Sequence, residues 1–305
     1  MASNPVPPPP PPPLRTSKPV QSTSSASGSV HTPGLNEEEE TRVTIQRLPD
    51  WRVISDRDSC SRWLACNRQV THVGQEGPTC GLVALSMAAI MLGLPGKTLA
   101  AILEAAKNRD FTRQGEMFSA KNTLTLAQEE LEMTGRLLSG DLMSNTLQIL
   151  THLAKSLPVL IPYDADYNHE PASRKGHRAH WAVLTGFLLS FPPDMKTTLP
   201  VECKKDLSTT NLVYLTPPWS AEDIANLPKL LMHTPHIYVF ARQGKSRLLG
   251  LWPFKTLAES NKNLEEYDPT KHALRGEFVF PEEGLTESLA LKAILLQTLN
   301  TEGPA

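Results

Sequence analysis

The apolar stretch from Leu82 to Leu94 constrains the fold of this chain more than any other segment. It is 13 residues long, whereas a helix that crosses a membrane needs about 20 apolar residues. Ala, Leu and Met predominate in it, Thr79-Cys80-Gly81 precedes it, and Gly93 and Pro95 close it. These residue types and this length favour a helix over a strand. We therefore expect a helix that is buried in a globular core.

Along the rest of the globular part, helical patterns come first and strand patterns follow. We expect helices near residues 98–108, 117–134 and 142–156, and a last helix over 286–299. Strand-like runs cover residues 158–163, 181–189, 212–215, 237–240 and 248–252. This order indicates an α+β fold, because a doubly wound fold would alternate strands and helices. Residues 191–235 carry many prolines and little periodicity, which indicates a long excursion or a flexible insertion.

The first 45 residues differ sharply in composition from the rest. They include a Ser/Thr/Gly-rich stretch and the acidic run Glu37–Glu40 without apolar periodicity, so burial cannot offset the entropy of ordering them. We expect a disordered, proline-rich tail over residues 1–45 and one globular domain over 46–305. Seven consecutive prolines in the tail form a stiff polyproline II segment, which fits either a spacer or a ligand for an aromatic-lined groove. The candidate partner-binding residues are Pro7, Pro8, Pro9, Pro10, Pro11, Pro12 and Pro13.

Overall composition narrows the classes of function. The chain has 305 residues, a formal net charge of -2 and 40% hydrophobic residues, which suits a soluble protein with a packed core. Its balanced charge gives no electrostatic reason to bind nucleic acid or an anionic membrane. Four cysteines are too few for a disulfide scaffold, and no metal-ligand motif, P-loop or secretory signal sequence is visible. We expect a cytoplasmic protein with reduced thiols, no cofactor and no metal.

The segment from Gln75 to Gly81, with the sequence QEGPTCG, concentrates the candidate chemistry. It places Cys80 where a helix begins, and the helix dipole and unpaired backbone N–H groups there favour a thiolate. The neighbouring glycines allow a substrate backbone to approach closely. The side-chain amide of Gln75 and the Cys80 N–H are candidates for the two donors of an oxyanion hole. A buried structural cysteine is the alternative, but the coincidence of these features favours a nucleophile.

The candidate general base is a histidine at the start of a strand. His180 immediately precedes an apolar run, so the sheet would hold its imidazole rigidly opposite a helix N-terminus. His177, in the preceding loop, is the competing choice. No Asp or Asn follows in the same strand to orient the imidazole, as a third group normally does. Three candidates for that orienting role are Gln243, Asp164 and Asp166.

The segments GPTCG and HWAVLTG together resemble the peptidase C39-like group of papain-like cysteine proteases. AHWAVLTGF, ARQGKSRLLGLWPF, ESNKNL and the proline-rich start extend the resemblance, within that group, to the family of proteases that mature actin. It covers roughly residues 60–280 and the polyproline tail. The resemblance implies a papain-like α+β domain, with the catalytic helix packed on an antiparallel sheet.

The same resemblance implies an activity and its residues. The activity is that of a cytosolic thiol aminopeptidase that removes the N-acetylated first residue, Met or Cys, from nascent actin. Cys80 would be the nucleophile, His180 the base and Gln75 the oxyanion glutamine. Profilin would be the partner that the proline-rich tail recruits.

Two other classes of function stay open on the residues alone. One is a non-catalytic adaptor, whose peptidase-like domain is tethered by the polyproline segment to cytoskeletal partners. The intact pair of Cys80 and His180 argues against it. The other is a different thiol acyl enzyme, such as an isopeptidase. An acidic substrate would need cationic contacts near the cleft, and the candidates, which could equally be ordinary solvated charges, are Arg174, Lys175, Arg178 and Lys245.

Overall fold

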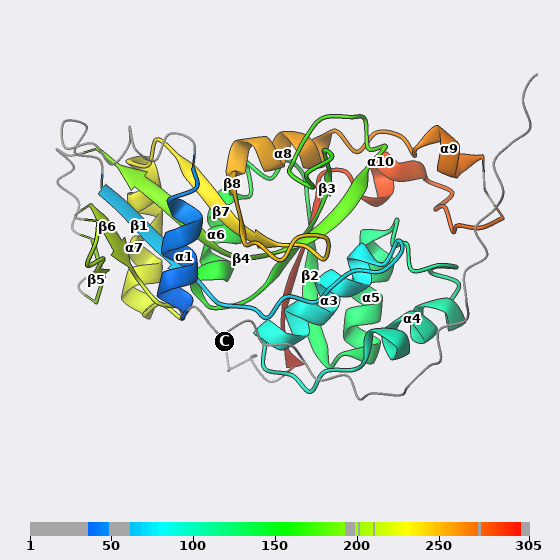
Figure 1. Cartoon of the computed structure of the whole chain (residues 1–305), viewed down its shortest axis with the longest axis horizontal. Coiled ribbons are helices and arrows are strands. Elements are labelled where there is room, and N and C mark those ends of the chain that lie inside the picture. The colour runs from blue at the N-terminus through cyan, green and yellow to red at the C-terminus, as the bar shows by residue number, and fades with distance from the viewer. Residues whose placement is uncertain are drawn as a thin grey trace, which may run out of the picture. The chain divides into compact units, whose positions relative to one another are not determined.

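The computed structural model describes residues 36–48, 62–192, 199–200, 202–209, 211–273 and 276–299, and the polyproline segment lies outside these ranges. Within them, nine strands form one sheet, and helices pack on both of its faces (Figure 1). This is the α+β class expected from the sequence. None of the helices in these ranges combines the length and the apolar character that crossing a membrane requires.

The element labels follow Figure 1, and their bounds are these. The helices are α1 (Glu37–Ile45), α3 (Cys80–Met91), α4 (Leu99–Asn108), α5 (Ala120–Glu130), α6 (Thr146–Ala154), α7 (Ala221–Met232), α8 (Phe254–Lys262), α9 (Pro269–His272) and α10 (Gly284–Ser288). The strands are β1 (Arg62–Asn67), β2 (Met133–Ser139), β3 (Val159–Asp164), β4 (Ala179–Phe191), β5 (Lys204–Lys205), β6 (Leu212–Tyr214), β7 (Ile237–Arg242), β8 (Gly250–Pro253) and β9 (Lys292–Thr298).

The long strand β4 organises the sheet. β3 pairs with its first half, β1 with its second half and β7 with its middle, all antiparallel. The strand order is β2-β9-β3-β4-β1-β6-β5, and β8 pairs with β7 beside it. The register of β4 against β7 shifts between Leu184 and Gly186. A Cβ at Gly186 would lie 2.0 Å from the carbonyl oxygen of Cys66, so this close approach requires glycine.

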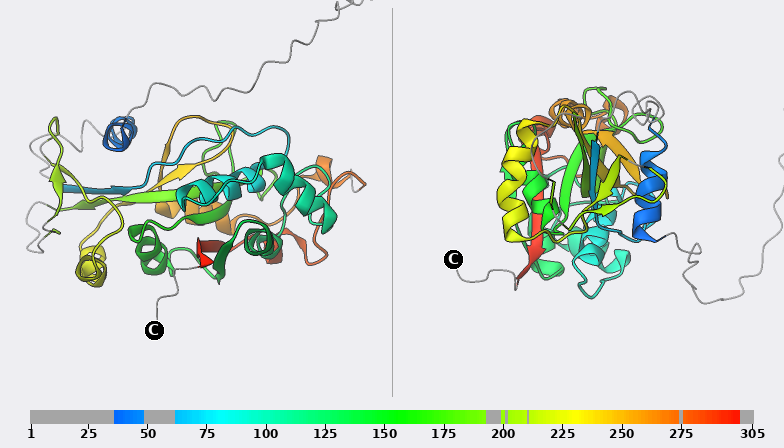
Figure 2. Two further views of the ribbon diagram at one scale, coloured as in Figure 1. Left: turned by 90° about the horizontal axis from the view of Figure 1, so that it is seen from below. Right: turned by 90° about the vertical axis from the view of Figure 1, so that its left-hand side faces the viewer.

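Each face of the sheet has its own apolar core. Successive residues of β4 point to opposite faces: Ala182 and Leu184 join the cluster under α6, α7 and α8, whereas Trp181 and Val183 join the cluster under α3, α4 and α5. A third cluster contains Ile45 of α1, which is fully buried. Figure 2 shows α1 and α7 on opposite sides of the sheet.

Helix α1 contradicts the expectation that residues up to 45 are disordered. The side chain of Asn36 caps it by accepting a hydrogen bond from the backbone N–H of Glu39 at 2.8 Å. The acidic run Glu37–Glu40 forms the first turn, where the helix dipole favours negative charge. The run that we interpreted as part of a tail therefore starts a helix, and packing of Ile45 offsets the entropy of ordering it.

Three further segments differ from the sequence prediction. Residues 117–134 are not one helix, because α5 ends at Glu130 and β2 begins at Met133. The helix expected over 286–299 is wrong, because most of this segment forms strand β9 between β2 and β3, where pairing overrides local propensity. The described part of 191–235 contains β5, β6 and α7, so this part is not an unstructured excursion.

Candidate active site

Cys80 is the first residue of α3, as the sequence predicted. Leu82, Val83, Ala84 and Leu85 behind it are fully buried and hold the helix in the core. The hydroxyl of Thr79 donates to the carbonyl oxygen of Glu76 at 2.7 Å and gives α3 no side-chain cap. Cys80 thus stands in the first turn of α3, where the helix dipole favours a negative charge.

His180 is the second residue of β4, at the predicted strand start. It pairs across the sheet with Tyr163, whose ring packs edge-on against the imidazole with centroids 5.6 Å apart. Burial is the main cause that lowers the pKa of His180 to about 3, and His169, Lys245 and Arg178 lower it further. The imidazole is consequently neutral at neutral pH, with a lone pair that can accept a proton.

Cys80, His180 and Gln75 line one cleft with a volume of about 430 Å³. They meet there because α3 packs against β4, which brings the start of the helix to the first residues of the strand. Residues singled out from two separate segments of the sequence thus share one site. No group of three or more His, Cys, Asp or Glu side chains in the described ranges is placed to hold a metal ion.

Gln243, directly after β7, is the predicted orienting residue that contacts the imidazole. Its side-chain oxygen Oε1 lies 3.4 Å from Nε2 of His180. The same oxygen accepts a hydrogen bond from the backbone N–H of Lys245 at 2.6 Å, which fixes its position. Because this oxygen can only accept, we assign the imidazole proton to Nε2 and the lone pair to Nδ1.

Gln75 lies in the cleft, but its amide is engaged within its own loop. Nε2 donates to the carbonyl oxygen of Gly77 at 2.8 Å, and Oε1 is buried without a hydrogen-bond partner among the described residues. The backbone N–H of Gln75 donates to Gly244 at 2.9 Å. A Cβ at Gly244 would lie 2.6 Å from Cβ of Gln75, so glycine lets the loop before Cys80 meet the turn after Gln243.

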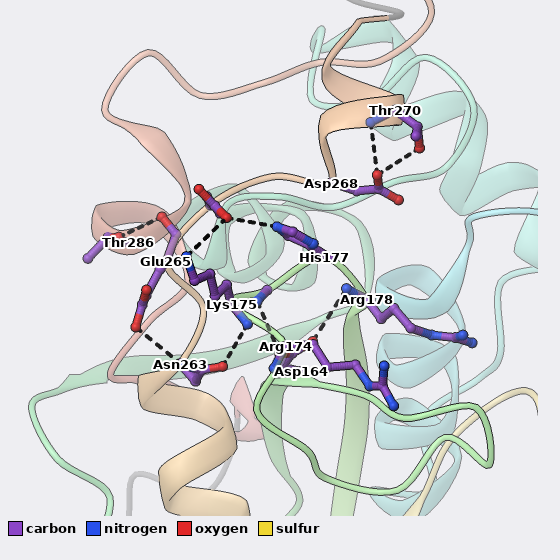
Figure 3. Close-up of polar contacts among 12 residues, drawn as sticks. Asp164, Arg174, Lys175, His177, Arg178, Asn263, Glu265, Asp268, Thr270 and Thr286 are labelled. Atoms are coloured by element: carbon purple, nitrogen blue, oxygen red, sulfur yellow. Dashed lines mark hydrogen bonds and ion pairs between the residues drawn. The ribbon is translucent and has the colours of Figure 1, made fainter.

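The other candidates contact different groups. Asp164 is fully buried, and its carboxylate accepts three backbone N–H groups from the loop 174–178 rather than an imidazole N–H (Figure 3). Asp166 accepts two backbone N–H groups within its own turn. Nε2 of His177 lies 2.9 Å from a carboxylate oxygen of Glu266, although the ring also lines the cleft.

His169 is a residue of the cleft that sequence reasoning missed. Its ring centroid lies 5.4 Å from that of His180, and its φ of 64° is in the left-handed region. The hydroxyl of Tyr163 donates to its carbonyl oxygen at 2.7 Å and holds the loop in place. Burial first, then Arg178 and Lys245, lower the pKa of His169. It lies in a loop of turn-forming residues, where no periodic pattern could single it out.

Comparisons with known proteins converge on one family. A family model described as "Actin maturation protease-like, C-terminal domain" matches residues 70–188. The chain is 39% identical over 267 residues to the actin maturation protease of Danio rerio, a match that covers 82% of this chain and 80% of that relative. It is 37% identical over 239 residues to the protein of the same name from Homo sapiens, covering 77% of this chain and 66% of the relative. No solved structure matches the chain.

Proposed function

The chain belongs to the actin maturation protease family, and on that premise we propose that it is a cysteine protease that removes the N-acetylated N-terminal residue, Met or Cys, from immature actin. The observation that carries the proposal is the cleft shared by Cys80, at a helix N-terminus, and His180. The names of the relatives support actin as the substrate. We also propose a papain-like architecture, because α3 packs on a largely antiparallel sheet.

The first half of the reaction forms an acyl-enzyme. His180 accepts the thiol proton of Cys80 at Nδ1, and the thiolate attacks the carbonyl carbon of the acetylated residue. The new anion raises the proton affinity of the imidazole beside it, and Gln243 accepts the Nε2 hydrogen bond. When the C–N bond breaks, the imidazolium gives its proton to the departing amine of shortened actin. A thioester between Cys80 and the acetyl-amino acid is left.

Donors to the developing oxyanion come from the loop before the helix. The backbone N–H of Cys80 and one N–H of the Gln75 amide are the proposed pair. The Gln75 amide uses one hydrogen bond to Gly77, and its nitrogen carries two N–H groups. In the second half of the reaction, His180 takes a proton from water, the hydroxide attacks the thioester, and the acetyl-amino acid leaves as the thiol is restored.

Recruitment and location complete the proposal. The residues Pro7–Pro13 lie outside the described ranges, and we propose that they bind profilin as a preformed polyproline II ligand. A cytoplasmic location follows from actin as substrate and profilin as partner. The proposal needs no cofactor, because thiol, imidazole and water supply every group that the reaction consumes.

The decisive experiment measures cleavage of a single bond in a short peptide. Purified protein is incubated with an acetyl-Met peptide, and mass spectrometry measures the release of acetyl-methionine. Cys80→Ala should abolish release, whereas Cys203→Ala should not, because burial raises the pKa of that thiol to about 12 and Cys203 is not among the residues that line the cleft. Release by the Cys80→Ala protein at the wild-type rate would refute Cys80 as the nucleophile, whereas no release by the wild-type protein would favour the non-catalytic adaptor.

A further inference from the structure

Two arginines beside the cleft share one aromatic ring. The guanidinium carbons of Arg174 and Arg178 lie 4.9 Å and 4.4 Å from the ring centroid of Tyr167. Tyr167 is 74% exposed, so both positive charges are held at the surface where a ligand can reach them. Within the described ranges, neither arginine has a carboxylate within ion-pair distance. Two like charges gathered on one ring repel each other, and an anion between them would remove that cost.

Asp164 fixes the loop from which these side chains project. Its buried carboxylate accepts the backbone N–H groups of Arg174, Gly176 and Arg178, the last two at 3.1 and 3.3 Å. Its own backbone N–H donates to the hydroxyl oxygen of Ser260 at 2.9 Å. In Figure 3 both arginine side chains extend from this loop in the same direction. The two guanidinium groups are therefore positioned by a rigid, internally bonded loop.

Lys175 and His177 of the same loop already contact a carboxylate. Nζ of Lys175 lies 4.0 Å from a carboxylate oxygen of Glu266, and Nε2 of His177 lies 2.9 Å from the same atom. The backbone N–H of Lys175 donates to the side chain of Asn263 at 2.7 Å. Lys175 and His177 thus contact the segment that follows α8, whereas Arg174 and Arg178 make no such contact in the described part of the chain.

The two carboxylates that line the cleft are held by hydrogen bonds and do not bind the arginines. Glu116 is buried and accepts the backbone N–H groups of Arg113, Gln114 and Val279 at 2.8 to 2.9 Å. Asp268 accepts both the backbone N–H and the hydroxyl of Thr270. The side chains of Arg178 and Lys245 line the same cleft without an ion pair to either acid. The guanidinium of Arg178 is accordingly not occupied by either carboxylate of the cleft.

We propose that Arg174 and Arg178, held on Tyr167, form a recognition site for two adjacent carboxylates in the peptide that follows the scissile bond. This inference rests on the proposed function, in which an acetyl group caps the residue removed, so every charged substrate residue lies downstream. Arg178 lines the cleft and Arg174 lies outside it. Arg178 therefore binds the carboxylate nearer the scissile bond, and Arg174 the next one. These are specificity-determining residues, distinct from the catalytic pair.

The test compares three acetyl-Met peptides in which the next two residues are both Asp, both Asn or both Lys. For the wild-type protein, kcat/KM should be about 10- to 100-fold higher for the Asp peptide than for the Asn peptide, with the Lys peptide poorest. Arg174→Gln and Arg178→Gln should each lower the Asp/Asn ratio by up to about tenfold. Lys175→Gln is the matched control, since it removes one charge from the same loop and should keep the ratio.

Charge reversal excludes a merely structural effect. Arg178→Glu should turn the preference from the Asp peptide toward the Lys peptide, and added salt should weaken the wild-type preference. An Asp/Asn ratio near one in the wild-type protein, or an equal fall in ratio for Lys175→Gln and Arg178→Gln, would overturn the inference.

A binding measurement separates the test of this inference from the test of the proposed function. Dissociation constants of the Asp and Asn peptides are measured on the Cys80→Ala protein, which cannot turn them over. Tighter binding of the Asp peptide, lost in Arg174→Gln and Arg178→Gln, supports the site even if no peptide is cleaved by the wild-type protein. If all three peptides are cleaved and the Asp and Asn peptides bind equally well, the recognition site is refuted while the proposed protease activity stands.

Discussion

Glu40 of α1 and Arg242 at the end of β7 form an ion pair, and Arg242 immediately precedes Gln243, the residue that contacts His180. The Arg242 guanidinium is almost wholly buried, and it also donates to the carbonyl oxygen of Arg247 at 2.7 Å. A buried charge whose partner is removed is strongly destabilising. The first described helix is therefore coupled to the turn that orients the candidate base.

Loss of α1 should destabilise the domain, whereas loss of the residues before it should not. Deleting residues 1–48 removes the partner of Arg242 and the buried Ile45, and we expect a loss of about 3 to 5 kcal/mol in unfolding free energy. Deleting residues 1–35 should leave the unfolding midpoint unchanged. Urea unfolding measures the stability of both truncated proteins. For single residues, Glu40→Gln should destabilise more than Glu39→Gln, since the Glu39 side chain is 41% exposed and lies 4.0 Å from its partner Arg42. Equal stability of the two deletions would contradict the coupling.

Gln243 should act on the imidazole rather than on substrate binding. Gln243→Ala should lower kcat by about 10²-fold with little change in KM, because His180 loses the acceptor that fixes its ring. Gln243→Glu should raise the pKa of His180 above its value of about 3, since an anion beside the imidazole favours the charged form. NMR titration of the His180 ring measures this shift directly. Ser246→Ala, in the same turn, serves as the control.

His180 and His177 should differ greatly when each is replaced. His180→Ala should lower kcat/KM by about 10³-fold or more, because it removes the group that moves protons in both halves of the reaction. His177→Ala should have a small effect, since that ring contacts Glu266. Steady-state kinetics on an acetyl-Met peptide compares the two. A larger loss for His177→Ala would mean that the base has been assigned to the wrong histidine.

Local sequence signals predicted the placement of Cys80 and His180 better than they predicted the sheet. The apolar run after Cys80 and the run after His180 each define one element, so the helix start and the strand start follow from short patterns. The sequence offered three residues that could orient His180. It could not single out Gln243, because the contact between Gln243 and His180 depends on how β7 pairs with β4. Strand β9 was mistaken for a helix for the same reason, since its partners β2 and β3 are distant in sequence.

His152 should make the fold sensitive to acid. It is half-buried, and Nε2 contacts the carbonyl oxygen of Leu296 at 2.9 Å. Burial lowers its pKa to about 4 from an ordinary 6.5. Between these values the unfolded chain binds a proton that the folded protein does not, so stability is complete above pH 6.5 and falls as pH drops toward 4. The full effect is about 3 kcal/mol.

Comparison with one variant isolates this effect of His152. His152→Gln keeps a donor for the Leu296 carbonyl but does not titrate. The difference in unfolding free energy between the wild-type and variant proteins should therefore shift against the wild type as pH falls from 7.5 to 4.5. Urea unfolding at several pH values measures it. A difference that stays constant over this range would show that His152 does not carry the acid sensitivity.

The tail should matter for whole actin and not for short peptides. Deleting residues 1–35 removes Pro7–Pro13 but keeps α1, so the catalytic domain and its turnover of an acetyl-Met peptide should be unchanged. With actin bound to profilin, a polyproline ligand raises the local concentration of substrate at the cleft. The truncated protein should then be slower at low actin and should match the full chain at saturating actin. Titrating actin with and without profilin provides the comparison, and equal rates at low actin in both proteins would reduce the polyproline segment to a spacer.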